Sequence, residues 1–186
     1  PGAITLEGAA GDGLALTLNP QPGVKPIVAR YAVLEPVQGP LPVAGTPDTL
    51  GVWVKGNSGW GRIVFEIVDA NGHRWRSNRG EEQSWDLSDW EGETSINHDG
   101  WRLVSLPLPD SYPSGYYKPS MRHWRRLGED EDGIPPPPAY PIAVTRLFVV
   151  LREQLVYGTT MTTPASPTIV LRDLTAGRRA DGGDAP

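Results

Sequence analysis

The chain has 186 residues, a length that fits one all-β domain, and its 22 Gly and 20 Pro favour short strands and long loops over helices. Its net charge of −5 and its scattered Arg residues argue against nucleic acid as a partner, because phosphate binding needs a basic stripe. The lack of Cys excludes disulfides and thiolate chemistry, and no run of 18 apolar residues predicts membrane insertion.

The predicted elements are short apolar or alternating runs separated by turns rich in Gly, Pro, Asn and Asp. In chain order, the predicted strands are residues 4–6, 14–18, 27–34, 50–55, 62–69, 73–77, 101–108, 143–152, 154–160 and 168–174. The predicted loops are 37–48, 78–100 and 110–141, with a short helical turn at 84–90 or 123–127 as an alternative. We therefore expect an all-β fold with little or no helix, a two-sheet antiparallel β-sandwich of jelly-roll type with long loops.

We expect residues 1–176 to form a single β-sandwich domain. Residues 177–186 (GRRADGGDAP) carry almost no apolar side chains and are predicted to be a flexible tail or linker. Because the chain begins at Pro1 and shows no signal peptide, we expect it to come from a larger protein, with any export signal outside this sequence.

The turn DANGH (69–73) permits two registers that differ in where they place charge. A two-residue loop would push Arg74 and Arg76 onto the core face. A three-residue loop with its glycine in the left-handed conformation sets Ile67 opposite Trp75 and keeps the charges on the other side. Because burying unpaired Arg is costly, the second register is predicted.

The preceding strands, 50–55 and 62–69, are predicted to pair as another hairpin with Lys55 opposite Arg62. The meander then separates an apolar face from a charged one. The predicted core face is Leu50, Val52, Val54, Ile63, Phe65, Ile67 and Trp75. The predicted outer face is Trp53, Lys55, Arg62, Val64, Glu66, Arg74 and Arg76.

Five segments together resemble bacterial carbohydrate-binding modules with a jelly-roll or galactose-binding-like fold. They are TLEGAAGD (5–12), LGVWVKG (50–56), IVFEIVDANG (63–72), GWRLVSLPL (100–108) and TIVLRDL (168–174). The resemblance implies a monomeric, noncatalytic module of an extracellular or periplasmic bacterial protein. Such a module binds a polysaccharide or oligosaccharide and targets a covalently attached glycan-degrading enzyme to it.

The same resemblance implies a structural Ca²⁺ that ties the first strand to the last. Glu7 and Asp173 are the candidate metal ligands, since hard cations prefer carboxylate and carbonyl oxygens. The alternative is that both are ordinary polar residues of their strands. The acidic run 129–132 lacks the spacing of a calcium-binding loop, and a solvated turn is predicted there.

One candidate ligand site lies on the predicted outer face. Trp53 would stack on a sugar ring while Glu66, Arg74 and Arg76 bind its hydroxyl groups through charge-assisted hydrogen bonds. The alternative is that other parts of the chain cover Trp53 and that Glu66 and Arg74 form a solvated pair. Trp101, at the start of a strand, is expected in the core.

A second candidate ligand site lies in the loop 110–141, which is rich in aromatic residues. Tyr116, Tyr117 and Trp124 would form a glycan platform at the rim of the sandwich. The alternative is that the loop packs down and its aromatic side chains form a satellite core.

The sequence predicts no catalytic group, so we expect that the chain is not an enzyme. Its three His residues are scattered, and the acidic cluster at 86–91 has no established carboxylate separation. GYYKPS (115–120) faintly resembles a strand of alginate lyases, but the companion motifs of those enzymes are missing. The alternatives to glycan binding are a structural sandwich that mediates protein or interdomain contacts and, less favoured, a jelly-roll polysaccharide lyase.

Overall fold

The structure, a computed structural model, describes residues 4–9, 13–18, 30–57, 61–77, 96, 98–109, 124–128, 136–151, 155–156, 159–160 and 168–178. All regular elements in these ranges are strands, and none is a helix that could cross a membrane. The strands are β1 (Ile4–Ala9), β2 (Gly13–Leu18), β3 (Arg30–Leu34), β4 (Leu41–Pro42), β5 (Thr49–Asn57), β6 (Gly61–Val68), β7 (Arg74–Arg76), β8 (Asp99–Pro107), β9 (Arg125–Arg126), β10 (Ala143–Leu151), β11 (Leu155–Val156), β12 (Thr159–Thr160) and β13 (Thr168–Gly177).

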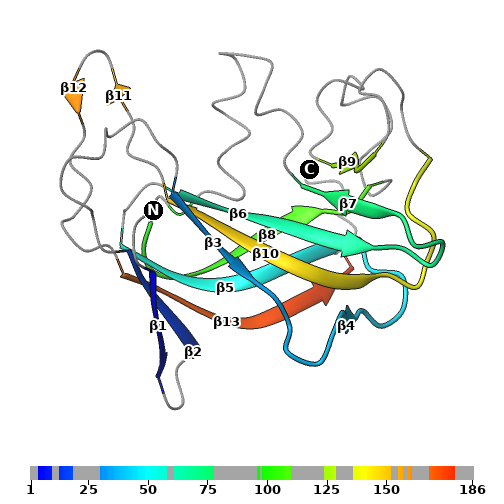
Figure 1. The fold of residues 1–186 in the computed structure, drawn as a ribbon, viewed down its shortest axis with the longest axis horizontal. Helices are drawn as coiled ribbons and strands as arrows, with labels where there is room; N and C mark the ends of the chain where they lie inside the picture. Colours follow the sequence, from blue (N-terminus) through cyan, green and yellow to red (C-terminus); the bar gives the residue numbers. More distant parts are fainter. Residues whose placement is uncertain are drawn as a thin grey trace, which may run out of the picture.

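These strands form two antiparallel sheets that lie over each other as layers (Figure 1). The sheet that we call the β5 sheet has the order β1-β2-β13-β5-β8. The other, the β6 sheet, has the order β3-β10-β6-β7-β9, with β4 paired to β10. β11 and β12 form a separate two-stranded pair. The prediction of an all-β, two-sheet antiparallel sandwich is confirmed, while the finer jelly-roll topology stays a prediction.

One hydrophobic core lies between the two sheets, because every second residue of the central strands points inward. The β5 sheet contributes Leu16, Leu50, Val52, Val54, Val104, Leu106, Ile169 and Leu171. The β6 sheet contributes Ile63, Phe65, Ile67, Trp75, Val144 and Val149. All seven residues of the predicted core face are therefore buried as expected.

The predicted hairpin between β5 and β6 is wrong, because these consecutive strands lie in different sheets. β5 pairs with β13 on one side and with β8 on the other. β6 pairs with β10 and β7. Alternation along a strand determines which side chains point inward, but it does not determine the partner strand. The core residues could therefore be identified from the sequence, even though the partner strands could not.

The predicted register of the β6–β7 hairpin is confirmed, with Ile67 opposite Trp75. The carboxylate of Asp69 holds the turn: its Oδ1 accepts hydrogen bonds from the backbone N–H groups of Asn71 and His73, both at 2.9 Å. Gly72 has the left-handed φ of 82° that the three-residue loop requires. Local turn chemistry therefore sets this register.

Several other expectations about elements are settled by the described residues. The predicted loop 37–48 contains the short strand β4, and the predicted strand 154–160 is represented by the two short strands β11 and β12. The alternative helical turn at 123–127 is wrong for the described residues there, which form β9 followed by a turn. The other alternative turn, at 84–90, lies outside the described residues.

Candidate functional site

The outer face of the β5 sheet presents two tryptophans on neighbouring strands. Trp53 on β5 lies opposite Leu103 on β8, and Lys55 lies opposite Trp101. The two indoles are therefore diagonal neighbours on one face, within reach of each other's side chains. Both are half-buried, and Trp101 is absent from the core cluster. The expectation that Trp101 is a core residue is wrong. Side chains alternate between the two faces along β8, and Trp101 is an odd number of residues away from the buried Val104, so Trp101 lies on the outer face.

Arg172 connects this surface to β13. It lies opposite Trp53 in the β13–β5 pairing, yet its guanidinium carbon lies 4.0 Å from the ring centre of Trp101. Because β5 separates β13 from β8, the Arg172 side chain extends across the outer surface of β5. A guanidinium held over an indole is a favourable cation–π contact. We call the surface of Trp53, Trp101, Leu103 and Arg172 the aromatic face.

Leu103 extends the apolar part of the aromatic face. Its side chain is 39% exposed, although it is one of the larger apolar residues of β8. A Cβ atom built on Gly51 would lie 3.0 Å from the Leu103 Cδ1 atom and 3.0 Å from the Ser105 Cβ atom. Leu103 therefore packs over the bare backbone of Gly51, beside Trp53, and a side chain at position 51 would displace it.

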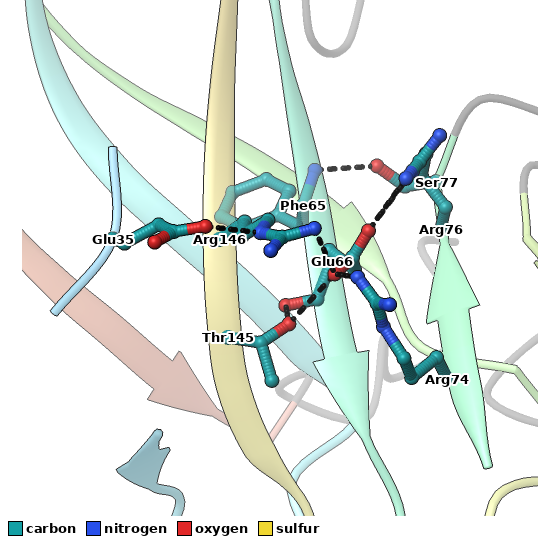
Figure 2. A network of polar contacts seen from close by, with 8 residues as sticks. All are labelled: Glu35, Phe65, Glu66, Arg74, Arg76, Ser77, Thr145 and Arg146. Atoms are coloured by element: carbon teal, nitrogen blue, oxygen red, sulfur yellow. Dashed lines mark hydrogen bonds and ion pairs between the residues drawn. The ribbon is translucent and has the colours of Figure 1, made fainter. Parts of the chain in front are cut away.

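The outer face of the β6 sheet is built around the carboxylate of Glu66 (Figure 2). Glu66 is 0% exposed although its strand position points away from the core. Its Oε2 atom accepts hydrogen bonds from the Nε atom of Arg76 at 3.1 Å and from its Nη2 atom at 2.7 Å. Its Oε1 atom accepts bonds from Nη2 of Arg74 and, at 3.1 Å, from the hydroxyl of Thr145.

Arg146 on β10 completes this network. Its Nη1 atom lies 3.7 Å from the Oε1 atom of Glu66, and its Nε atom donates to Oε1 of Glu35 at 2.5 Å. Arg76 also lies over the ring of Phe148, with 4.8 Å between its guanidinium carbon and the ring centre. A single buried carboxylate therefore holds three guanidinium groups in place.

The electrostatics of Glu66 follow from these contacts. Burial alone would raise its pKa, but the hydrogen bonds from Arg74, Arg76 and Thr145 outweigh burial and lower the pKa from its ordinary value. Glu66 is therefore ionised at neutral pH, and both of its oxygen atoms already accept hydrogen bonds. Its carboxylate organises the surrounding arginines and has little capacity left for the hydroxyl groups of a ligand.

The structure separates the residues that were predicted to form one sheet-face site. Trp53 lies on the outer face of the β5 sheet, whereas Glu66, Arg74 and Arg76 lie on the outer face of the β6 sheet. The core lies between these two surfaces. Their grouping depended on a β5–β6 hairpin, and it fails because that hairpin does not form.

The predicted loop site is only partly described. Tyr116 and Tyr117 lie outside the described residues. Trp124 is 2% exposed and belongs to the core cluster. Its Nε1 atom donates a 2.8 Å hydrogen bond to the carbonyl of Pro107. Trp124 therefore follows the alternative, a packed aromatic residue with a satisfied indole N–H, rather than a surface platform.

The two candidate calcium ligands are not on neighbouring strands. Glu7 on β1 is paired with Ala15 on β2, and β2 separates β1 from β13. Asp173 sits where the β13–β5 register shifts, with a positive φ of 49° and a side chain that is 69% exposed. Across the described ranges, no three His, Cys, Asp or Glu side chains gather as a metal-binding group. The calcium site stays a prediction.

Sequence reasoning missed the partners that long-range pairing supplies. Arg172 and Trp101 reach the aromatic face from strands far from Trp53 in the chain. Thr145 and Arg146 reach Glu66 from β10 at a register shift. The signal for Trp101 was available, since WRLVSL alternates and places Trp101, Leu103 and Ser105 on one side. No comparable signal identified Arg146.

No family model, curated protein or solved structure matches this chain. The functional argument therefore depends on the geometry of its two outer faces.

Proposed function

We propose that this chain is a noncatalytic carbohydrate-binding module, and that the aromatic face is its glycan-binding surface. The supporting observation is the pair of half-buried indoles, Trp53 and Trp101, on adjacent strands of one sheet face. In the bacterial extracellular or periplasmic setting implied by the resemblance, the module would keep an attached catalytic domain near its polymeric substrate.

The chemistry of the aromatic face suits a sugar ring better than a purely apolar ligand. The C–H surface of a pyranose stacks on an indole, and its hydroxyl groups need donors and acceptors at the ring edge. Arg172 on Trp101 and the exposed ammonium of Lys55 supply donors, and Asp173 next to Arg172 supplies acceptors. Charged partners make the stronger hydrogen bonds to such hydroxyl groups.

A protein or interdomain contact is the second candidate, and the exposure of Leu103 favours it. A Leu beside Trp53 extends the apolar surface in the way that a protein interface requires. The two functions predict different consequences for Leu103→Ser. Glycan stacking depends on the indoles and tolerates that change, whereas a protein contact loses buried apolar area.

The test is binding of the 186-residue chain to a panel of neutral and acidic polysaccharides, by affinity electrophoresis and then by calorimetry. At least one polysaccharide should bind. Trp53→Ala and Trp101→Ala should each weaken that binding about tenfold or more, because the first removes an indole from the face and the second releases the Arg172 guanidinium that lies over the Trp101 ring.

Phe148→Ala is the matched control, because it removes an aromatic ring from the outer face of the other sheet. It should leave the binding of neutral polysaccharides unchanged. The proposal fails if no polysaccharide retards the folded chain, or if both Trp variants bind as tightly as the parent. Melting curves of every variant separate loss of binding from loss of fold.

A further inference from the structure

A row of charged side chains crosses the outer face of the β6 sheet. Pairing sets Arg146 opposite Glu66, Glu66 opposite Arg76, and Arg76 opposite Arg125. Directly opposed residues of antiparallel strands project to the same side of the sheet. Arg74, two residues before Arg76, shares that side as well. We call Arg74, Arg76, Arg125 and Arg146, with Glu66 and Glu35, the arginine face.

The charges of the arginine face do not balance. Among the described residues, its four guanidinium groups meet two carboxylates, so two positive charges remain in excess. Glu66 neutralises one charge, and both its oxygens are occupied by Arg74, Arg76 and Thr145. Glu35 is bound to Arg146 and lies at the exposed edge, where its side chain is 57% exposed. The excess is therefore centred on β7 and β9.

Arg125 is the clearest sign of this excess. It lies directly opposite Arg76, and like charges in that position repel each other. Within the described part of the chain, no carboxylate pairs with Arg125, and its Nε atom is buried with no hydrogen-bond partner. A buried donor without an acceptor is costly, and an anion bound over the outer surface of the two strands would offset the repulsion between Arg76 and Arg125.

The neighbouring guanidinium groups are held in position and still have donors to offer. Arg76 uses Nε and Nη2 on Glu66 while its guanidinium lies against Phe148, and Arg74 uses Nη2. The Nη1 groups of both residues donate to no acceptor among the described residues. The side chains of Arg74 and Arg76 are 45% and 25% exposed, so a ligand in solvent can reach them.

We propose that the arginine face is a binding site for an oxyanion, a carboxylate or sulfate group, which is recognised by the Nη1 groups of Arg74 and Arg76 and by the charge of Arg125. Guanidinium forks match the geometry of carboxylate and of tetrahedral oxyanions. The buried Glu66 fixes the forks before the ligand arrives, so little side-chain entropy is lost on binding. This site is independent of glycan binding by the aromatic face, which lies on the other side of the core.

The experiment titrates the chain with sodium sulfate, glucuronate and, as a neutral probe, glucose, at constant ionic strength set by chloride. Melting temperature and calorimetry measure binding, and the Nε–Hε NMR signals of the arginine side chains show where the anion binds. Sulfate and glucuronate should raise the melting temperature saturably and shift the signals that Arg74→Gln or Arg125→Gln removes, whereas glucose should leave those signals unchanged. Arg74→Gln and Arg125→Gln should each weaken the binding about tenfold.

Arg172→Gln is the matched control, since it removes a guanidinium from the aromatic face and should leave sulfate affinity unchanged. Oligomers of glucuronate, tested on the Trp53→Ala/Trp101→Ala variant so that the aromatic face does not contribute, identify the source of the oxyanion: binding tighter than the monomer assigns it to an acidic glycan, and equal binding assigns it to a free small anion. The proposal is overturned if sulfate and glucuronate stabilise no more than chloride does. It is also overturned if the Arg74→Gln/Arg125→Gln double variant keeps the parent affinity.

Discussion

The two outer faces of the sandwich satisfy their side chains in different ways. On the arginine face, a carboxylate that is 0% exposed collects hydrogen bonds from Arg74, Arg76 and Thr145. On the aromatic face, the indoles stay half-buried and the main polar contact is a guanidinium lying on a ring. The first face is held together by charge pairs around a buried carboxylate. The second leaves apolar surface in contact with solvent, which is what a stacking ligand can use.

The largest expected effect comes from breaking the centre of the arginine face. Glu66→Gln should lower the free energy of unfolding by about 3 kcal/mol, because it leaves Arg74, Arg76 and Arg146 facing an amide in place of a carboxylate. Urea denaturation measures this change. Removing Trp53 from the aromatic face should cost less stability, since its indole is not part of the core cluster.

Glu35→Gln is the matched control for Glu66→Gln. Both residues are Glu partners of Arg146, but the Glu35 side chain is 57% exposed. An exposed pair contributes roughly 0–1 kcal/mol, so Glu35→Gln should change stability little. Equal losses in the two variants would show that burial does not distinguish these carboxylates and would remove the physical basis of the comparison.

Acid should weaken the arginine face before it affects the aromatic face. Burial would raise the pKa values of Glu66 and Asp69, but hydrogen bonds outweigh it, and both pKa values are lowered from ordinary values of 4.5 and 3.8. A group whose pKa is lower in the folded state stabilises the fold above its unfolded pKa. That stability is lost as the pH falls through the folded pKa.

We therefore expect the melting temperature to be nearly constant at neutral pH and to fall as the pH drops below about 4.5. The Glu66→Gln variant should show a shallower fall, because it lacks one of the two carboxylates whose pKa is lowered among the described residues. Thermal melts from pH 7 to pH 2.5 measure both curves. Parallel curves for the variant and the parent would contradict the assignment of this acid sensitivity to Glu66.

The sequence was sufficient to predict local structure, but it was insufficient to predict which strands share a sheet and therefore which side chains share a face. The β6–β7 register was predictable because Asp69 and Gly72 specify the turn, and inward positions were predictable because strands alternate. The partners of β5 were not predictable, since β8 and β13 lie far along the chain and any apolar alternating strand could have paired there.

The same limit explains the candidate sites. Trp53 and Glu66 each point away from the core, as predicted from their strands, but alternation does not tell on which of two sheets a strand lies. Once β5 and β6 are in different sheets, the predicted site divides in two. Arg172 then lies beside Trp53 on one face, and Arg146 lies beside Glu66 on the other. Both positions depend on strand pairings that only the fold supplies.

A smaller effect is expected from filling the bare backbone of the aromatic face. Gly51→Ala places a Cβ atom 3.0 Å from Leu103 Cδ1 and from Ser105 Cβ, and 3.2 Å from Thr175 Oγ1. Leu103 must move, so the free energy of unfolding should fall by about 1–2 kcal/mol. Gly177→Ala is the control, because among the described residues its Cβ atom meets only Thr49 Oγ1, at 3.8 Å. If the two variants melt alike, Leu103 does not pack over position 51.

The smallest expected effect has the opposite sign and tests whether the arginine face carries excess charge. Arg125→Gln removes the repulsion with Arg76 without touching a carboxylate, so the free energy of unfolding should rise by about 0.5 kcal/mol in dilute buffer. The gain should shrink at 1 M salt, where screening removes the repulsion. Arg146→Gln, the same substitution at a residue bound to Glu35 and Glu66, should instead lower stability. A loss at both positions would mean that Arg125 stabilises the fold and that β9 carries no unbalanced charge for an anion to relieve.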